Sequence, residues 1–310
     1  MMRVLVTGGA GFIGSHITEE LLAHNHEVAV IDNLSSGKRN QVPAGVVFYE
    51  GDVKKREIGN FYSDFQPDVV IHLAAQVSVA KSFQEPLNDS EENIIATINV
   101  LEACVKHHVK KIIFASTAAL YGSPGYLPVD EYHTINPISF YGLSKQHAEA
   151  YIKMFSERYG LPYTILRYAN VYGMRQDANG EAGVVSIFIE KFLNNEPLAV
   201  FGDGTQTRDF IFVKDVARAN IAALTNGENE IINISTEKQT SILDIVKKLN
   251  EITGKNELPV FYEERTGDIK DSCLTNEKAE TVLGWKPIYS FTEGLKETIY
   301  YYEKEMLIQS

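Results

Sequence analysis

The amino-terminal segment constrains the fold more than any other part of the chain. A short apolar run at residues 3–7 leads into Gly8, Gly11 and Gly14, and a second apolar run at residues 27–31 ends at Asp32. Glycines spaced in this way permit a tight turn, let the backbone approach a pyrophosphate and let a helix pack close to a strand. The order predicts a strand, a glycine turn, a helix from about residue 15 to residue 23, and a second strand.

The acid at the end of the second strand indicates which nucleotide such a turn would hold. Asp32 follows Gly14 by 18 residues, about where a carboxylate accepts hydrogen bonds from an adenosine ribose. The helix amino terminus offers N–H groups to the phosphates. Asp32 favours NAD, because a 2′-phosphate would meet a like charge at close range. Lys38 and Arg39 are able to pair with such a phosphate, so NADP stays an alternative.

The rest of the chain repeats the alternation of strand and helix. The pattern predicts strands at 46–49, 69–73, 111–116 and 162–168, and one long helix from about 90 to 108. Alternation of this kind predicts an α/β fold, a Rossmann-type doubly wound parallel sheet with helices on both faces. Ligands bind beyond the carboxyl ends of its strands. Six candidate site residues fall at or just past predicted strand ends: Gly8, Asp32, Asp52, Ala74, Ser116 and Tyr168.

Composition excludes several classes of partner. The 310 residues suffice for one large domain or two unequal ones, and 44% of them are hydrophobic. A net charge of −12 disfavours nucleic acid and anionic membranes, so an anionic ligand would need local positive charge. No apolar run reaches the roughly 18 residues of a membrane span. Two cysteines, Cys104 and Cys273, and no secretory signal predict a cytoplasmic protein.

Tyr141 and Lys145 indicate proton chemistry. A free tyrosine has a pKa of about 10, so its phenolate is scarce at neutral pH. A lysine four residues on lies on the same helix face, and its positive charge favours the phenolate. A base of this kind can take the proton from a sugar hydroxyl while hydride leaves the same carbon.

Short motifs recur along nearly the whole chain. The amino-terminal half carries TGGAGFIG at 7–14, HLAA at 72–75, STAALYG at 116–122, YGLSK at 141–145 and LRYANVYG at 166–173. The carboxyl-terminal half carries FGDGTQTRDF at 201–210, VKDVA at 213–217, RTGD at 265–268 and LGW at 283–285. Together these motifs resemble those of one known family, the extended short-chain dehydrogenases/reductases, and within it the UDP-glucose (UDP-galactose) 4-epimerases.

The resemblance implies NAD-dependent epimerisation at C4 of a UDP-hexose through a transient 4-keto sugar. Thr117 stands where the family has the hydroxyl that bonds the sugar 4-oxygen, with Ser116 as its neighbour and fallback. Nucleotide-sugar 4,6-dehydratases usually carry acidic residues directly after this hydroxyl, whereas this chain has Ala118 and Ala119. A dehydratase therefore remains the second hypothesis. A non-catalytic NAD-binding regulator is the third, and the intact Tyr141 and Lys145 oppose it.

The resemblance also implies the site residues. The catalytic residues are Tyr141, Lys145 and Thr117. The implied NAD-binding residues are Gly8, Gly11, Phe12, Ile13, Gly14, Asp32, Asn33, Ser36, Gly37, Asp52, Val53, Leu73, Ala74, Ala75, Gln76, Asn93, Ser116, Tyr141, Lys145 and Tyr168. The implied substrate-binding residues are Thr117, Tyr141, Asn170, Arg208, Arg265, Asp268 and Ser272, with the two arginines on the diphosphate because guanidinium groups match phosphate oxygens. No metal is expected.

Three positions depart from the usual pattern and bear on the substrate. Met174 stands where proline commonly follows Val-Tyr-Gly, and Phe140 precedes the catalytic tyrosine where proline or serine is common. Both positions are expected at the rim of the pocket. Ser272 falls where epimerases limited to non-acetylated sugars tend to have a bulky aromatic. Its small side chain predicts that UDP-GlcNAc and UDP-GalNAc are accepted together with UDP-glucose and UDP-galactose.

The expected organisation is a Rossmann-type NAD-binding domain at 1–169, with a return segment near 209–235, and a smaller carboxyl-terminal α/β domain at 170–310 that mainly binds the nucleotide sugar. The predicted helix at 90–108 has a broad apolar stripe, which suggests burial against both the sheet and a partner subunit. Its members are Ile94, Ile95, Ile98, Leu101, Cys104 and Val105. A homodimer built on this helix and the helix after Tyr141 is therefore expected.

Overall fold

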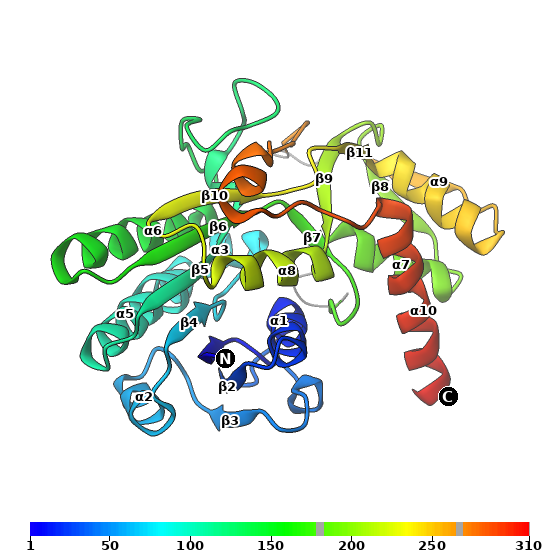
Figure 1. Cartoon of the computed structure of the whole chain (residues 1–310). Helices are drawn as coiled ribbons and strands as arrows, with labels where there is room; N and C mark the ends of the chain where they lie inside the picture. Colours follow the sequence, from blue (N-terminus) through cyan, green and yellow to red (C-terminus); the bar gives the residue numbers. More distant parts are fainter. Residues whose placement is uncertain (178–182, 265–268, 310) are drawn as a thin grey trace.

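A seven-stranded parallel sheet forms the centre of the computed structural model, which describes residues 1–177, 183–264 and 269–309 (Figure 1). The strand order is β10-β6-β5-β4-β1-β2-β3, and every pairing is parallel. The strands are β1 (Arg3–Thr7), β2 (Glu27–Asp32), β3 (Val47–Glu50), β4 (Val69–His72), β5 (Lys111–Thr117), β6 (Tyr163–Tyr168) and β10 (Glu230–Ile234). The predicted Rossmann-type fold is confirmed.

The sheet is buried on both faces, which explains why its central strands are nearly continuous runs of valine, leucine and isoleucine. Side chains alternate between the faces: Val4 and Val6 of β1 belong to one apolar core, and Leu5 belongs to the other. Helices α1 (Phe12–Ala23) and α8 (Val213–Ala223) cover the first face, and α2 (Gly59–Phe65), α5 (Ala96–Lys106) and α6 (Phe140–Tyr159) cover the second.

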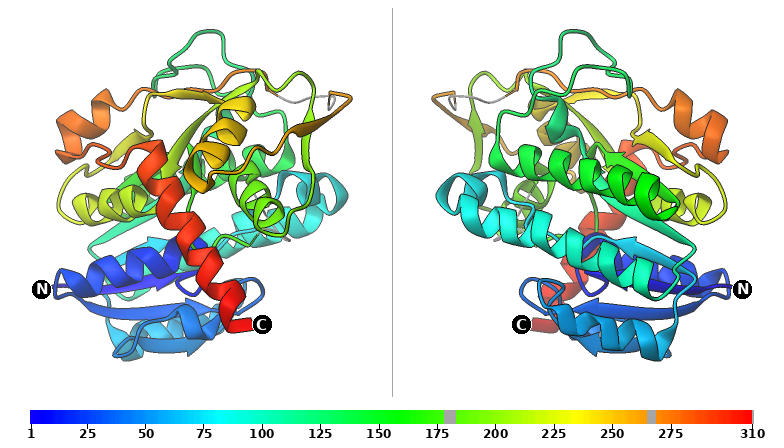
Figure 2. Two further views of the ribbon diagram at one scale, coloured as in Figure 1. Left: turned by 90° about the vertical axis from the view of Figure 1, so that its right-hand side faces the viewer. Right: turned by 90° about the vertical axis from the view of Figure 1, so that its left-hand side faces the viewer.

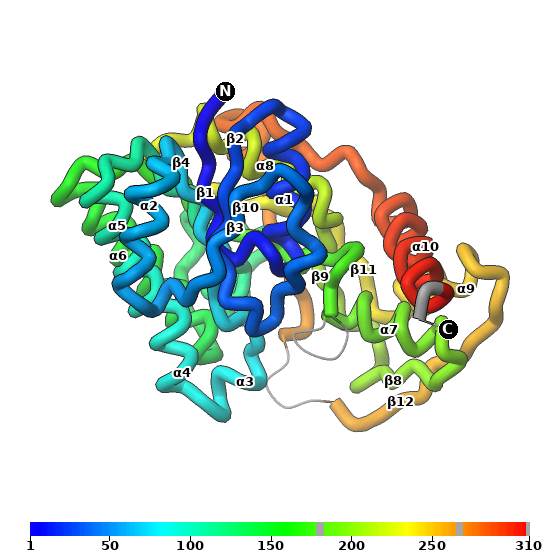
Figure 3. The backbone as a smooth tube through the Cα atoms, turned by 90° about the horizontal axis from the view of Figure 1, so that it is seen from below, coloured from blue at the N-terminus to red at the C-terminus, as the bar shows by residue number. Residues whose placement is uncertain are grey.

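A group of shorter strands and their helices gathers on one side of the large sheet (Figure 3). A three-stranded sheet has the order β11-β9-β7, and β12 pairs with β8 in a two-stranded one. The strands are β7 (Asn170–Tyr172), β8 (Leu198–Phe201), β9 (Thr207–Phe212), β11 (Gln239–Ser241) and β12 (Pro259–Tyr262). Helices α7 (Val184–Leu193), α9 (Ile242–Thr253) and α10 (Phe291–Gln309) enclose a third apolar core with β7, β8 and β9. Figure 2 shows the length of α10.

The chain returns to the large sheet after it has begun the smaller part. Directly after β9, α8 packs on the same core as α1, and β10 then pairs with β6 as the outermost strand of the large sheet. The chain therefore passes between the large sheet and the smaller part more than once. A domain boundary at residue 169 stays a prediction.

Two predicted helix bounds differ from the structure. Helix α1 begins at Phe12 rather than near residue 15. Its N-cap is Gly11, and no side chain caps it, so the sequence lacks the capping residues that usually mark where a helix begins. The predicted helix at 90–108 is a series: α4 (Pro86–Ser90), a π-helical turn η3 (Glu91–Ile95) and α5. On its predicted stripe, Leu101 and Cys104 are buried, whereas Ile95 is 49% exposed.

Among the helices of the described residues, none is both long and apolar enough to cross a membrane.

Candidate active site

The turn between β1 and α1 forms a cradle that only glycine fits. Gly8 has a φ of +71°, and a Cβ atom there would lie 2.8 Å from the Ala74 backbone nitrogen. A Cβ atom at Gly14 would lie 2.1 Å from the Gly8 carbonyl oxygen, so the helix could not approach the turn. The amino terminus of α1 therefore opens directly onto the ends of β1 and β4, as a pyrophosphate-binding turn requires.

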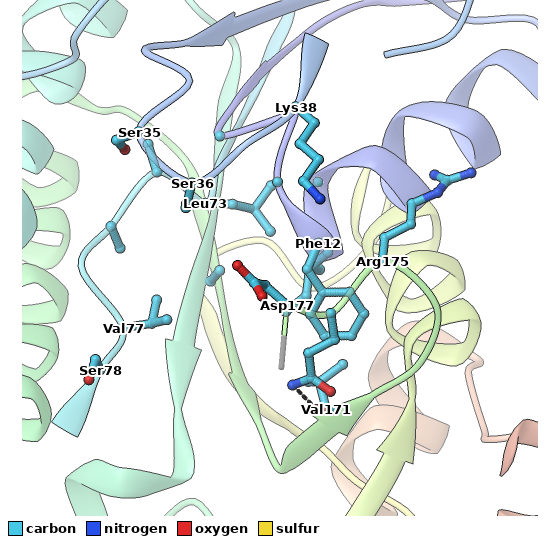
Figure 4. A pocket seen from close by; sticks show the side chains of 18 of the residues that line it. Phe12, Ser35, Ser36, Lys38, Leu73, Val77, Ser78, Val171, Arg175 and Asp177 are labelled. Atoms are coloured by element: carbon cyan, nitrogen blue, oxygen red, sulfur yellow. Dashed lines mark hydrogen bonds between the residues drawn. The ribbon is translucent and has the colours of Figure 1, made fainter. Parts of the chain in front are cut away.

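A cavity of about 1220 Å³ lies beyond the carboxyl ends of the strands, over this turn. In Figure 4, Lys38 and Phe12 extend into the space across from Leu73 and Val77. Most of the predicted cofactor and catalytic residues line it: Gly8, Gly11, Phe12, Ile13, Gly14, Asp32, Asn33, Ser36, Val53, Leu73, Ala74, Ala75, Ser116, Thr117, Tyr141, Lys145 and Tyr168. The residues present thus fit a dinucleotide.

Asp32 is held in place at the end of β2. Its Oδ2 accepts a hydrogen bond from the Ala10 backbone nitrogen at 2.9 Å, and its Oδ1 accepts one from the Leu34 nitrogen at 2.8 Å. Burial raises the pKa of this carboxyl, and the two N–H groups oppose that shift. A carboxylate fixed in this way has lone pairs left for a ribose diol.

Four residues predicted to bind the cofactor are not among those that line the cavity. Gly37 packs close to Asp32, because a Cβ atom there would lie 2.9 Å from Asp32 Oδ1. Asp52 Oδ1 accepts a hydrogen bond from the Lys54 backbone nitrogen. Gln76 and Asn93 are buried and bond one another, since the Gln76 nitrogen donates to Asn93 Oδ1 at 2.9 Å. Cofactor contacts by these four stay a prediction.

Tyr141 and Lys145 lie in the first turns of α6. Ser139 caps this helix by accepting a hydrogen bond from the Gly142 nitrogen at 3.1 Å, which fixes where the helix begins. Lys145 is 3% exposed, and its Nζ lies 4.3 Å from the centre of the Phe114 ring. Burial lowers the pKa of Lys145 to about 7, and the carboxylates of Glu149 and Asp89 oppose that shift.

The adjacent hydroxyls of Ser116 and Thr117 have different partners. Ser116 Oγ donates to Glu149 Oε1 at 2.6 Å, so its proton is already used inside the protein. Thr117 Oγ1 accepts a hydrogen bond from the Ala119 nitrogen at 3.1 Å and keeps its own proton for donation. Thr117 lines the cavity together with Tyr141, and it is the better placed of the two to bond a substrate oxygen.

A buried ion pair beneath these residues was not predicted. Arg167 of β6 donates to both oxygens of Glu149, from Nε at 3.0 Å and from Nη2 at 2.7 Å. Its Nη1 donates to the Tyr121 hydroxyl at 2.9 Å. Glu149 follows Lys145 by one turn on the buried face of α6. That spacing could have indicated a buried glutamate on this helix. The sequence alone does not show that its partner is an arginine of β6.

A second cavity of about 390 Å³ adjoins the first, and Tyr141 lines both. Asn170 and Arg208, two of the predicted substrate-binding residues, line this second cavity. Arg208 Nη1 donates to the Thr207 carbonyl oxygen at 2.8 Å, which orients the guanidinium group. Apolar side chains that the sequence did not indicate complete the wall: Val184, Val185, Phe188, Val200 and Phe201.

The other predicted substrate residues are placed differently. Arg265 and Asp268 lie outside the described residues. Ser272 is described but lines neither cavity, and its backbone nitrogen donates to the Thr207 carbonyl oxygen at 3.2 Å, next to Arg208. A contact between Ser272 and a sugar stays a prediction.

Met174 and Phe140, the two residues expected at the pocket rim, make contacts in different parts of the structure. The Met174 carbonyl oxygen lies 3.1 Å from His16 Nε2, a contact made by the backbone of Met174. Phe140 is half-exposed and meets Phe83 edge-on, with ring centres 5.8 Å apart, on the outer surface of α6. Neither residue lines the two cavities.

A parallel sheet, a glycine cradle, an acid on the second strand and a tyrosine–lysine pair define a nicotinamide-dinucleotide enzyme of the short-chain dehydrogenase/reductase type. The model of the NAD dependent epimerase/dehydratase family matches residues 4–235. The chain belongs to this family, so NAD is its cofactor.

Solved structures agree with this assignment. A UDP-glucose 4-epimerase from Thermotoga maritima, solved with UDP-glucose, is 46% identical with a TM-score of 0.96, covering 98% of this chain and 100% of that one. A Thermus thermophilus UDP-glucose 4-epimerase, solved with NAD, is 42% identical with a TM-score of 0.93, covering 97% and 99%. A UDP-N-acetylglucosamine 4-epimerase from Methanobrevibacter ruminantium, in complex with UDP-N-acetylmuramic acid, is 37% identical with a TM-score of 0.94, covering 98% and 99%.

Proposed function

We propose that this protein catalyses the NAD-dependent epimerisation of a UDP-hexose at C4, with UDP-glucose and UDP-galactose as substrates. One observation carries the proposal: Tyr141 lines both cavities, so it lies between the dinucleotide cradle and the site that contains Arg208. A substrate whose diphosphate is bound by Arg208 would extend its sugar toward Tyr141, Thr117 and the cofactor.

The chain's own residues supply the proton chemistry. Tyr141, held as a phenolate by the charge of Lys145, removes the proton from the sugar 4-hydroxyl. Thr117 donates a hydrogen bond to the 4-oxygen and limits its movement. NAD, held by the glycine turn and Asp32, would supply the hydride acceptor for C4 and, once reduced, the donor that restores hydride on the opposite face of the sugar. The protein therefore ends each cycle in the state in which it began.

The two other hypotheses are less well supported. A 4,6-dehydratase needs acid–base groups to remove water across C5 and C6, and Ala118 and Ala119, the residues that directly follow Thr117, provide none. A regulator that only binds NAD has no use for a buried lysine beside a tyrosine. Replacement of Tyr141 by phenylalanine should abolish turnover and preserve folding and NAD content; unchanged turnover would contradict the proposed base.

The proposed substrate range includes UDP-GlcNAc and UDP-GalNAc. The support is the small side chain of Ser272 next to Thr207, the residue that precedes Arg208. The relative from M. ruminantium, whose name states an N-acetylated substrate, is consistent with this range. The Ser272→Tyr variant should lose activity on UDP-GlcNAc and keep activity on UDP-glucose. Full activity of this variant on the acetylated sugar would remove Ser272 from the argument.

The direct test is proton NMR of the purified protein with UDP-galactose, and separately with UDP-GlcNAc, without added NAD. Appearance of the C4 epimer would establish the reaction and a retained cofactor together. A 4-keto-6-deoxy product would show a dehydratase instead. No conversion even with added NAD would reject the proposed substrate class.

The proposal includes a cytoplasmic location and a homodimer. The homodimer is supported by a group of exposed apolar side chains on α3 (Val79–Gln84), α4, η3 and α6, the elements around the predicted interface helix. The group, here called the α6 surface, consists of Phe83, Leu87, Ile95, Phe140, Leu143 and Met154. Exposed apolar side chains that are grouped in this way are typical of a protein interface.

A further inference from the structure

A buried aspartate lies behind the tyrosine–lysine pair and has no assigned role. Asp89 of α4 is 1% exposed. Its Oδ1 accepts hydrogen bonds from Gln76 Nε2 at 2.7 Å and Asn93 Nδ2 at 3.3 Å. Its Oδ2 is buried and has no hydrogen-bond partner among the described residues. An ionised carboxylate out of water is costly unless a cation lies near it.

The groups that hold Asp89 also bind the helix of the catalytic residues. Asn93 Nδ2 donates to Ser144 Oγ at 2.9 Å, and Ser144 Oγ donates to the Tyr141 carbonyl oxygen at 3.0 Å. Ser144 directly precedes Lys145. The π-helical turn η3 brings Asn93 into this position between α4 and α6. Its amide supplies donors but no net charge, so the charge of Asp89 is left for another group to balance.

Lys145 is the buried cation next to this network, because Asn93 joins Asp89 to Ser144, the residue that directly precedes Lys145. The groups around the Lys145 ammonium are Tyr141 and Glu149 on α6, the Phe114 ring on β5, His72 on β4 and Asp89 on α4. Glu149 is already balanced by Arg167. Burial lowers the pKa of His72 to about 3, so His72 is neutral near pH 7. Among the described residues that face Lys145, Asp89 is therefore the carboxylate without a cation of its own.

We propose that Asp89 is the counter-ion of Lys145, a positioning residue that keeps the lysine ammonium charged beside Tyr141. The catalytic part of this inference rests on the proposed function of Lys145; the counter-ion relation does not. It also gives Gln76 and Asn93 a role, since both donate hydrogen bonds to the carboxylate and hold it in place.

The test is the titration of Lys145 in the protein as purified. Asp89→Asn removes the charge with little disturbance. The amide keeps an oxygen in place of Oδ1, which can accept both hydrogen bonds, and its NH₂ group replaces Oδ2, which accepts none. The ε-carbon signal of Lys145 is followed by ¹³C NMR against pH and assigned from Lys145→Arg. We expect the midpoint to fall by about one unit, a tenfold change in the ratio of charged to neutral lysine.

A matched control has the same loss of charge nearby. Glu91→Gln changes an exposed acid two residues along the chain and should leave the Lys145 midpoint where it is in the wild type. If Asp89→Asn does not fold, Asp89→Ser keeps an acceptor for the amides and should shift the midpoint in the same direction. A midpoint that is unchanged in the folded Asp89 variant overturns the inference.

The pH profile of kcat separates this inference from the proposed function. With the counter-ion removed, Lys145 loses its proton at lower pH, so the alkaline limb of the profile should move down by the same interval as the NMR midpoint. A shifted midpoint with an unshifted profile would support the counter-ion and contradict the role of Lys145 in turnover. The NMR readout needs no substrate, so it holds even if the sugar has been misassigned.

Discussion

Ser116 and Thr117 are neighbours on β5 that should respond differently to truncation. Thr117→Val removes the hydroxyl proposed to bond the sugar oxygen, and kcat should fall by about 10²-fold, as when a donor to a developing oxyanion is lost. Ser116→Ala removes a buried hydrogen bond to Glu149, so its larger effect should be on stability, about 1 kcal/mol. Steady-state kinetics and thermal melts of both variants check this. A larger loss of kcat in Ser116→Ala would reverse the assignment.

His72 makes a second residue-level prediction, on acid stability. Its Nδ1 and Nε2 bond the hydroxyls of Thr7 and Thr97, at 2.7 and 3.0 Å. Its folded pKa of about 3 lies below the ordinary 6.5, so below pH 6.5 the unfolded chain binds a proton that the folded one does not. Its contribution to stability is present above pH 6.5 and is lost as the pH falls toward 3.

The measurement is urea unfolding at several pH values between 6.5 and 4. Wild type should lose about 1.4 kcal/mol per pH unit through this one residue. His72→Gln, which can keep one donor and one acceptor, should show a shallower slope. Parallel slopes in the two proteins would mean that the buried imidazole takes up a proton in the folded state.

Site residues that stand in short sequence motifs could be predicted. Site residues whose partners come from distant parts of the chain could not. Gly8, Asp32 and Tyr141 stand in short motifs whose chemistry depends on near neighbours in the chain. Arg167 and Asp89 gain their meaning only when β6 and α4 approach α6. Aspartates on helix surfaces are common, so burial had to be known before Asp89 stood out.

At the scale of elements, the close approach of α1 to β1 should depend on Gly14. Gly14→Ala would place a methyl group 2.1 Å from the Gly8 carbonyl oxygen, so the turn must open. We expect loss of bound NAD, read from the absorbance of the nucleotide released on denaturation, and a lower melting temperature. Gly59→Ala is the matched control, since its nearest neighbour, His107 Nε2, would be 3.7 Å away. NAD retention in Gly14→Ala would contradict the cradle.

The strands of the large sheet could be predicted because buried parallel strands are short apolar runs between turn residues. The π-helical turn at Glu91–Ile95 could not, because an apolar stripe on a helix looks much the same with one wider turn in it. The missed turn mattered, since it places Asn93 against Ser144. The smaller strands β7 and β11, each three residues long, were likewise too short to give a periodic signal.

At the scale of the whole molecule, the α6 surface should decide the oligomeric state. Met154→Glu puts a charge on a side chain that is 60% exposed in the single chain and would be buried in the interface of the proposed dimer. Light scattering should show a dimer for wild type and a monomer for this variant. Leu258→Glu, at an exposed apolar position distant from α6 in the fold, should remain a dimer. A monomeric wild type would remove the homodimer from the proposal.

The position of β10 also limits how this molecule could be divided. A fragment ending at residue 169 would contain the cradle, Asp32 and Tyr141, yet it would lack α8 and the strand that covers the edge of β6. That fragment would expose an unpaired strand edge and the apolar face of α1, both of which promote aggregation. The cofactor half is therefore not a transferable module, and exchanging substrate specificity between relatives calls for grafting loops rather than swapping halves.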